Sequence, residues 1–202
     1  MDSTIDLFPI TLKKGTIKPS EEDDRISYDL LSCLFSDCDN NSWTGESGLS
    51  TGQHSLALYE HKELQWFYSQ LHEHVQQYWN SLGYRQSCKI FLVNSWANHH
   101  QQDDTTAEHS HSDGSHGGNH ISGVYYFRKP ENDGHITFCD PIDYIRRLCP
   151  YERMFGIDTI GQQVQAEQYE FILFPSWMRH RVERYNTQKE RIAISFNYRG
   201  FW

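Results

Sequence analysis

Residues 173–197 read LFPSWMRHRVERYNTQKERIAISFN, and this stretch decides the fold. It holds two β-rich runs, 178–182 and 191–198, on either side of the polar, turn-like segment ERYNTQKE. We expect the two runs to pair as an antiparallel hairpin, which would set His180 and Arg191 on neighbouring strands. Both residues stand in apolar runs, where an ionisable side chain needs a partner.

Other strand-like runs precede this stretch, and two helix-like segments precede the strands. The runs are rich in β-branched and aromatic residues, and they cover 89–98, 121–127, 135–138 and 169–174. Apolar residues at steps of three and four predict helices at about 20–34 and 63–82. Helices followed by many short strands are typical of a mainly β fold with supporting N-terminal helices, a sandwich or jelly roll.

The length and composition favour one domain in a reducing compartment. At 202 residues the chain suits a single domain, 1–202, with a helical support region, 1–84, and a β core, 85–202. The net charge of −9 argues against broad nucleic-acid binding, which uses a basic surface. The five cysteines form no zinc-type pairs, and neither a signal peptide nor a membrane span is evident. We expect free thiols and a cytoplasmic location.

A histidine-rich stretch, HSHSDGSHGGNH at 109–120, lies directly before the run at 121–127. His111 and Asp113 form a His-x-Asp pair, and alternate residues of an extended chain reach the same side. With a distant histidine such as His180, they would form the two-histidine, one-carboxylate site of non-haem Fe(II). A solvated polar loop and a hydrogen-bonded core histidine would explain the same residues without a metal.

Arg191 adds a second element to this candidate site. A guanidinium inside an apolar strand is costly unless it meets an anion, and it suits a carboxylate in a bidentate arrangement. The alternative is a buried structural salt bridge to one of the chain's many acidic residues.

Taken together, these motifs resemble the 2-oxoglutarate/Fe(II)-dependent oxygenases, in particular a small family from bacteria and phages related to prolyl hydroxylases. The matching stretches run from LFPI at 7–10 through SWAN at 95–98, SGVYYF at 122–127, GHITFCDP at 134–141 and LFPSWMRHRV to RIAISFN. The resemblance implies a double-stranded β-helix, a cupin-like jelly roll, with Fe(II) and 2-oxoglutarate as cofactor and cosubstrate.

The resemblance also implies roles for individual residues. His111, Asp113 and His180 would be the catalytic metal ligands. Arg191 and Tyr126 would bind the remote carboxylate of 2-oxoglutarate, with Asn98, Ser195 and Asn197 in the same region. Asn98 could equally be a strand-end cap.

Two features depart from the pattern of the family. Many of its relatives carry Arg-x-Ser, whereas position 193 is alanine, so a hydroxyl at the cosubstrate carboxylate is missing or comes from elsewhere. The loop also offers His109 beside His111, because first ligands in this family often read His-x-His. Counting back from SGVYY favours His111 and Asp113, with His109 as the competing ligand.

The implied reaction is hydroxylation of an unactivated C–H bond with O2, with release of succinate and CO2. The kinship favours a peptidyl substrate such as proline, and a small metabolite is also possible. Two rival functions are a non-catalytic, cupin-like metal or ligand binder and an interaction domain with a metal-binding loop. The rivals predict no turnover of 2-oxoglutarate.

Overall fold

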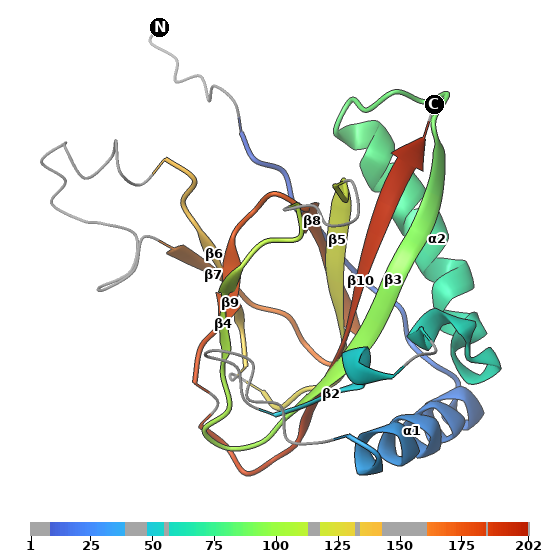
Figure 1. Ribbon diagram of the computed structural model, residues 1–202, viewed down its shortest axis with the longest axis vertical. Helices are drawn as coiled ribbons and strands as arrows, with labels where there is room; N and C mark the ends of the chain where they lie inside the picture. Colours follow the sequence, from blue (N-terminus) through green and yellow to red (C-terminus); the bar gives the residue numbers. More distant parts are fainter. Residues whose placement is uncertain are drawn as a thin grey trace, which may run out of the picture.

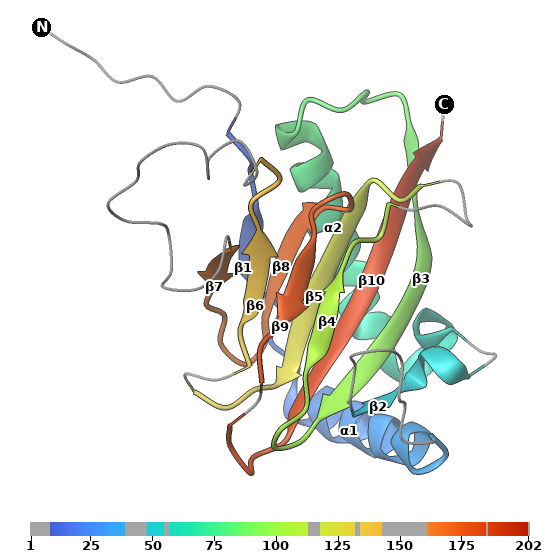
Figure 2. The same cartoon turned by 60° about the vertical axis from the view of Figure 1, so that its left-hand side comes forward.

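The computed structural model describes residues 9–38, 48–54, 57–112, 118–131, 134–142, 161–184 and 186–201. Two antiparallel sheets face each other, and the helices lie outside the larger one (Figure 1). The six-stranded sheet has the order β1-β8-β5-β10-β3-β2, and the four-stranded sheet has the order β4-β9-β6-β7. Figure 2 shows the smaller sheet in front of the larger one.

The strands of the larger sheet are β1 (Lys13–Thr16), β2 (Leu49–Ser50), β3 (Lys89–His100), β5 (Ile121–Arg128), β8 (Glu170–Pro175) and β10 (Arg191–Phe201). Those of the smaller sheet are β4 (Thr106–His109), β6 (Ile136–Cys139), β7 (Gly161–Val164) and β9 (His180–Val182). The helices are α1 (Glu21–Ser36) and α2 (Gln65–Ser81), with short 3-10 turns at Thr51–Gln53, Leu58–Glu60 and Lys62–Leu64. The predicted mainly β jelly-roll fold with supporting helices is confirmed. No helix in the described ranges is long and apolar enough to cross a membrane.

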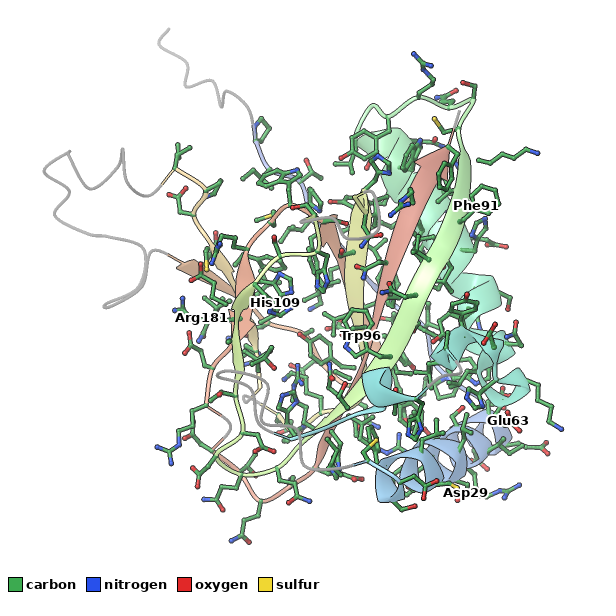
Figure 3. The ribbon with its side chains drawn as sticks, viewed as in Figure 1. Asp29, Glu63, Phe91, Trp96, His109 and Arg181 are labelled. Carbon is green, nitrogen blue, oxygen red and sulfur yellow. The ribbon has the colours of Figure 1, made fainter. Side chains whose placement is uncertain are left out.

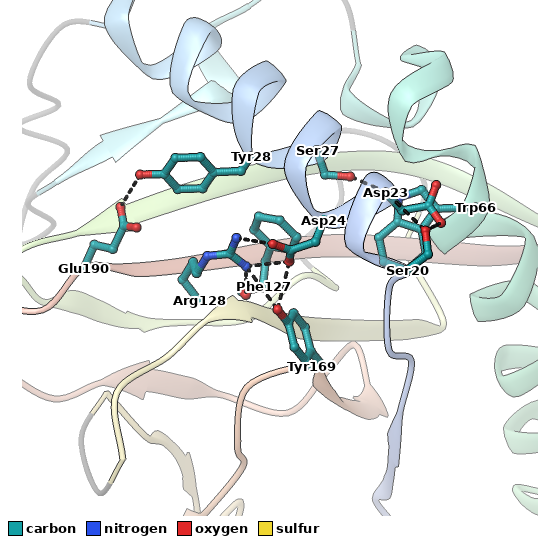
Figure 4. Close-up of polar contacts among 10 residues, drawn as sticks. All are labelled: Ser20, Asp23, Asp24, Ser27, Tyr28, Trp66, Phe127, Arg128, Tyr169 and Glu190. Carbon is teal, nitrogen blue, oxygen red and sulfur yellow. Dashed lines mark hydrogen bonds and ion pairs between the residues drawn. The ribbon is translucent and has the colours of Figure 1, made fainter.

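Helix α1 begins where its sequence predicts. The Ser20 hydroxyl accepts a hydrogen bond from the Asp23 amide, and four acidic residues occupy the first turn at the positive end of the helix dipole. One of them, Asp24, fastens the helix to the larger sheet. Its carboxylate lies 2.7 Å from Arg128 of β5 and accepts a hydrogen bond of 2.8 Å from the Tyr169 hydroxyl (Figure 4).

Alternation along the strands separates two apolar cores. On the outer face, aromatic residues such as Phe67 of α2 and Tyr125 of β5 pack with ring centroids 4.4 Å apart. On the inner face, between the sheets, the second core includes Tyr126, Phe174 and Ala193. The candidate site residues of β3, β5 and β10 belong to this inner face.

The expected hairpin between the last two strands is wrong. β9 pairs with β4 and β6 in the smaller sheet, whereas β10 pairs with β3 and β5 in the larger one. The segment 183–190 therefore connects two sheets. The turn-like residues mark a change of direction, but they do not specify the pairing partner, and β10 already has a neighbour on each side.

Among the described residues, four short strands were not predicted from the sequence, namely β1, β2, β4 and β7. All four have partly or fully exposed residues, and they contain few large apolar side chains. Such strands show no alternation of apolar and polar residues, and they form because a neighbouring strand supplies hydrogen bonds. Strand β4 is the most important of them for the site, because its last residue is His109, the first residue of the histidine-rich stretch.

Candidate metal centre and cosubstrate site

Three histidines meet between the ends of β4 and β9. The ligand atoms of His109, His111 and His180 all lie within 4.8 Å of one another. His109 stands opposite His180 in the β4–β9 register, with ring centroids 4.4 Å apart, and His111 follows two residues after His109. This arrangement could hold one metal ion, because three nitrogen ligands converge on a common point.

Backbone carbonyls orient two of these imidazoles. The His109 Nδ1 atom lies 2.8 Å from the Ala107 carbonyl oxygen, and the His180 Nδ1 atom lies 3.0 Å from that of Met178. Each Nδ1 must therefore carry the proton and donate, so each Nε2 keeps a lone pair for a metal. Metal-binding histidines usually donate their other ring N–H to a carbonyl or carboxylate in this way.

His111 is fixed through its backbone. Its amide donates to the Ser176 carbonyl at 2.9 Å, and its own carbonyl accepts from the Asn119 side chain at 3.0 Å. The Ser176 hydroxyl bonds at 2.8 Å to that of Ser122, which donates to Asn197 at 2.6 Å. A buried polar chain thus links the β8–β9 corner and the His111 backbone to the larger sheet.

The protonation states suit a cation. Burial, and secondarily the neighbouring imidazole of His109, lowers the pKa of His111 to about 3. The same two causes, with His111 as a further neighbour, lower the pKa of His180 to about 3. Both rings are neutral at pH 7, and neutral imidazole is the form that binds metals.

The structure brings together two of the three predicted ligands. His111 and His180 lie in the cluster, and the third member is His109, the competing ligand in the sequence. Asp113 and His116 lie outside the described residues. His120 is turned toward the helical side, where its ring lies 5.6 Å from that of Trp79 and its Nδ1 accepts from the Gly200 amide.

Arg191 and Tyr126 form a second group on the inner face. The Arg191 side chain is 2% exposed, and its guanidinium carbon lies 5.3 Å from the centre of the Tyr126 ring. Its Nη1 donates to His100 Nδ1 at 2.9 Å and its Nε to the Gly134 carbonyl at 3.1 Å. Burial raises the pKa of the Tyr126 hydroxyl, although the nearby Arg191 charge opposes this effect.

The Tyr126 hydroxyl provides a test of whether a carboxylate fits here. It is fully buried, and the neighbouring Arg191 guanidinium can donate to the phenol oxygen but cannot accept its proton, so the hydroxyl has no acceptor among the described residues. A buried hydroxyl without an acceptor is costly, and a carboxylate beside it would accept its hydrogen bond while facing a guanidinium. The residues present therefore fit the remote carboxylate of 2-oxoglutarate.

The remaining predicted residues lie on the same inner face. Asn98 on β3 pairs with Ala193 on β10, which in turn pairs with Tyr126 on β5. Ser195 pairs with Trp96, and both are partly exposed although they point between the sheets. This partial exposure shows that solvent reaches this part of the inner face.

Two residues of this region were not predicted. The ring of Trp96 lies 5.7 Å from that of His111, and Figure 3 shows Trp96 and His109 on facing strands of the two sheets. His100 contacts Arg191 directly. A signal was present, since Trp96, Asn98 and His100 occupy alternate positions of one strand and so share a face.

Comparison with known proteins agrees with this geometry. Residues 94–197 match the model of a family described as "Putative 2OG-Fe(II) oxygenase". No curated protein sequence gives a significant match. The matched region contains all three clustered histidines, together with Tyr126 and Arg191.

Solved structures share the fold at low sequence identity. A Pseudomonas putida prolyl-4-hydroxylase is 12% identical with a TM-score of 0.60, covering 94% of this chain and 92% of its own. A viral collagen prolyl hydroxylase from Paramecium Bursaria Chlorella virus-1, in complex with 2-oxoglutarate, is 10% identical with a TM-score of 0.58, covering 95% and 96%. HygX from Streptomyces hygroscopicus, with nickel, 2-oxoglutarate and hygromycin B bound, is 10% identical with a TM-score of 0.58, covering 94% and 82%.

The family match spans just over half of the chain, and the fold agrees with it. The chain belongs to the 2-oxoglutarate/Fe(II)-dependent oxygenases, enzymes that use Fe(II) and 2-oxoglutarate.

Proposed function

We propose that this oxygenase hydroxylates an unactivated C–H bond of a peptidyl residue, with proline favoured, and releases succinate and CO2. The observation that carries the proposal is that the three-histidine cluster and the Arg191–Tyr126 group both adjoin the inner core. Phe174 of that core contacts His180, with ring centroids 4.8 Å apart, and Tyr126 is a member of the same core.

We assign the metal to His109, His111 and His180. Their neighbouring nitrogen atoms support this set among the described residues, which do not include Asp113 of the predicted set. The carbonyl contacts at Nδ1 of His109 and His180 hold the Nε2 atoms toward the ion and limit rotation of the rings. When bound, Fe(II) with 2-oxoglutarate supplies the O2-dependent oxidation that converts 2-oxoglutarate to succinate and CO2.

Arg191 and Tyr126 would bind the remote carboxylate of 2-oxoglutarate. A guanidinium that is 2% exposed has lost most of its hydration, so a charge-assisted contact to a carboxylate is strong there. The Tyr126 hydroxyl adds a donor that has no acceptor among the described residues. The two residues would orient the cosubstrate by its far end.

The substrate would approach along the inner face of β3. Trp96 is partly exposed there, beside His111, and a flat aromatic ring can pack against the ring of a prolyl residue. The structural similarity to two prolyl hydroxylases supports a peptidyl substrate. The free thiols of Cys33, Cys88 and Cys139 support a reducing, cytoplasmic location.

The test begins with protein made metal-free and reconstituted anaerobically with Fe(II). Addition of 2-oxoglutarate should produce a weak visible charge-transfer band, and admission of air should release succinate. Proline-containing peptides should then stimulate succinate release and gain one oxygen atom, measured by mass spectrometry. Absence of both the band and succinate would overturn the oxygenase assignment, whereas succinate without peptide oxidation would overturn only the peptidyl substrate.

A further inference from the structure

His100 is a buried histidine with partners on both sheets. It ends β3, is 3% exposed, and stands directly opposite Arg191 in the β3–β10 register. Its Nδ1 lies 2.9 Å from Arg191 Nη1, and its Nε2 lies 3.0 Å from the Thr106 hydroxyl oxygen on β4. The ring therefore bridges the strand that carries Arg191 and the strand that carries His109.

The partners determine which nitrogen carries the proton. Arg191 can only donate, so His100 Nδ1 must accept, and Nε2 then carries the proton and donates to Thr106. The imidazole is neutral, because burial and secondarily the adjacent guanidinium lower the pKa of His100 to about 3. A protonated ring would have no lone pair to offer Arg191.

A neutral acceptor has a particular consequence for Arg191. An aspartate or glutamate at position 100 would fix the guanidinium equally well, but it would also neutralise its charge. The imidazole orients the guanidinium without adding a negative charge that would compete with an anionic ligand.

We propose that His100 is a positioning residue that holds Arg191 in the orientation that binds the remote carboxylate of 2-oxoglutarate. His100 would thereby set the preference of the site for 2-oxo acids with a second carboxylate. This inference rests on the proposed function, because it takes Arg191 as the residue that binds the cosubstrate.

The experiment measures binding to the full chain loaded with Mn(II), by calorimetry. The two probes are 2-oxoglutarate and 2-oxopentanoate, which has the same chain length and lacks the remote carboxylate. The variants are His100→Leu, which loses the acceptor, His100→Asn, which keeps a neutral acceptor near the position of Nδ1, and His100→Asp, which supplies a charged one. The thermal unfolding of each variant and its affinity for Mn(II) alone are measured in parallel.

His100→Leu should weaken 2-oxoglutarate binding by about 10- to 100-fold, the effect expected when a buried charged group loses its hydrogen-bond partner. Its affinity for 2-oxopentanoate and for Mn(II) should change little. His100→Asn should restore most of the 2-oxoglutarate affinity. His100→Asp should not restore it, because the new carboxylate competes for Arg191.

His99→Asn is the matched control. His99 is the preceding residue of β3, and its side chain faces the other way, with its ring 5.3 Å from that of Phe35. This variant should bind both probes as the unaltered chain does. An Arg191→Ala background supplies a second control, in which His100→Leu should have no further effect on 2-oxoglutarate binding.

If His100→Leu lost equal affinity for both probes, the residue would be merely structural. If a folded His100→Leu variant kept full affinity for 2-oxoglutarate, the residue would have no role in binding. Either result would overturn the inference. Rescue by aspartate as well as by asparagine would overturn the argument from charge. Failure of the unaltered Mn(II)-loaded chain to bind 2-oxoglutarate would instead overturn the proposed function, and the inference with it.

Discussion

His109 on β4 and His180 on β9 are cross-strand partners whose imidazole rings lie 4.4 Å apart. The edge strand β4, which has little apolar content, thus carries one candidate ligand, His109. The other, His180, begins β9 directly after the β8–β9 corner. The spacing between them is set by the pairing of the strands. The metal site that we propose therefore includes His109, because the strand pairing holds its ring beside that of His180.

Loss of His109 should abolish tight metal binding. Removing a group that hydrogen-bonds to a metal ligand already costs about 10- to 100-fold in metal affinity. Removing a ligand itself, in His109→Ala, His111→Ala or His180→Ala, should therefore cost at least about 100-fold. Asp113→Ala should keep most of the affinity. Titration of the metal-free protein with Mn(II) measures these effects.

The reverse pattern would restore the ligand set predicted from the sequence. If Asp113→Ala lost the metal and a folded His109→Ala kept it, the assignment of His109 would be wrong. His120→Ala is a useful control, because that ring lies against Trp79 and takes no part in the cluster.

The metal-free protein should lose stability in mild acid. Burial is the main reason that the pKa values of His100, His111 and His180 are lowered to about 3, whereas the ordinary value is 6.5. Between these values the unfolded state binds more protons than the folded state. These neutral histidines therefore contribute fully to the stability of the folded state above pH 6.5. Their contribution is lost as the pH falls toward 3.

Urea unfolding of the metal-free protein at several pH values checks this prediction. The free energy of unfolding should fall from about pH 7 to about pH 5. His100→Asn removes one of the three histidines whose pKa is lowered to about 3, so its decline should be shallower. An unfolding free energy that stays constant over this range would contradict the burial of neutral histidines.

The contact between α1 and the larger sheet should contribute to stability without affecting the site. Asp24→Asn removes the charge that faces Arg128 and should destabilise the protein by about 1–3 kcal/mol, the usual cost of losing a hydrogen bond to a charged group in a partly buried position. Affinity for 2-oxoglutarate should not change. Chemical denaturation and calorimetry measure the two quantities.

Asp29→Asn is the control within the same helix. The ion pair of Asp29 with Arg25 spans 3.4 Å, and both side chains are about two-thirds exposed, so its loss should change stability by less than about 0.5 kcal/mol. If the two substitutions lowered the free energy of unfolding equally, the Asp24 contact would contribute no more to stability than an exposed ion pair.

Much of this site could be predicted from the sequence, because several of its residues disturb a local pattern. His180 and Arg191 are ionisable residues in apolar strands, and SGVYYF marks a buried strand that carries Tyr126. The position of His109 beside His111 and His180 could not be predicted in this way, because it depends on the pairing of β4 with β9. That pairing is long-range, and β4 has too little apolar periodicity to reveal it.

The contact between His100 and Arg191 was hidden for a similar reason. The two residues are far apart in the chain, and only the register of β3 with β10 places them opposite each other. The expected hairpin between the last two strands was wrong for the same reason. Turn residues indicate where a strand ends, but they do not determine which strand it pairs with. Strands and buried ionisable residues can be predicted from the local sequence, whereas the registers between strands cannot.

Trp96 should determine how the substrate is held. Its partly exposed ring lies beside His111, so Trp96→Ala should raise the KM of a peptide substrate by about tenfold or more through lost aromatic packing. The metal and cosubstrate sites remain, so release of succinate without peptide oxidation should increase relative to coupled turnover. Succinate and oxidised peptide are measured in the same reactions.

Trp96→Phe should retain most of the coupling, because it keeps an aromatic ring on the inner face of β3. Phe91→Ala provides the control, since Phe91 is a 48% exposed aromatic residue near the opposite end of the same strand. It should leave KM and coupling unchanged. If Trp96→Ala and Phe91→Ala behaved alike, the substrate would not approach along the inner face of β3, and the packing of a prolyl ring against Trp96 would be wrong.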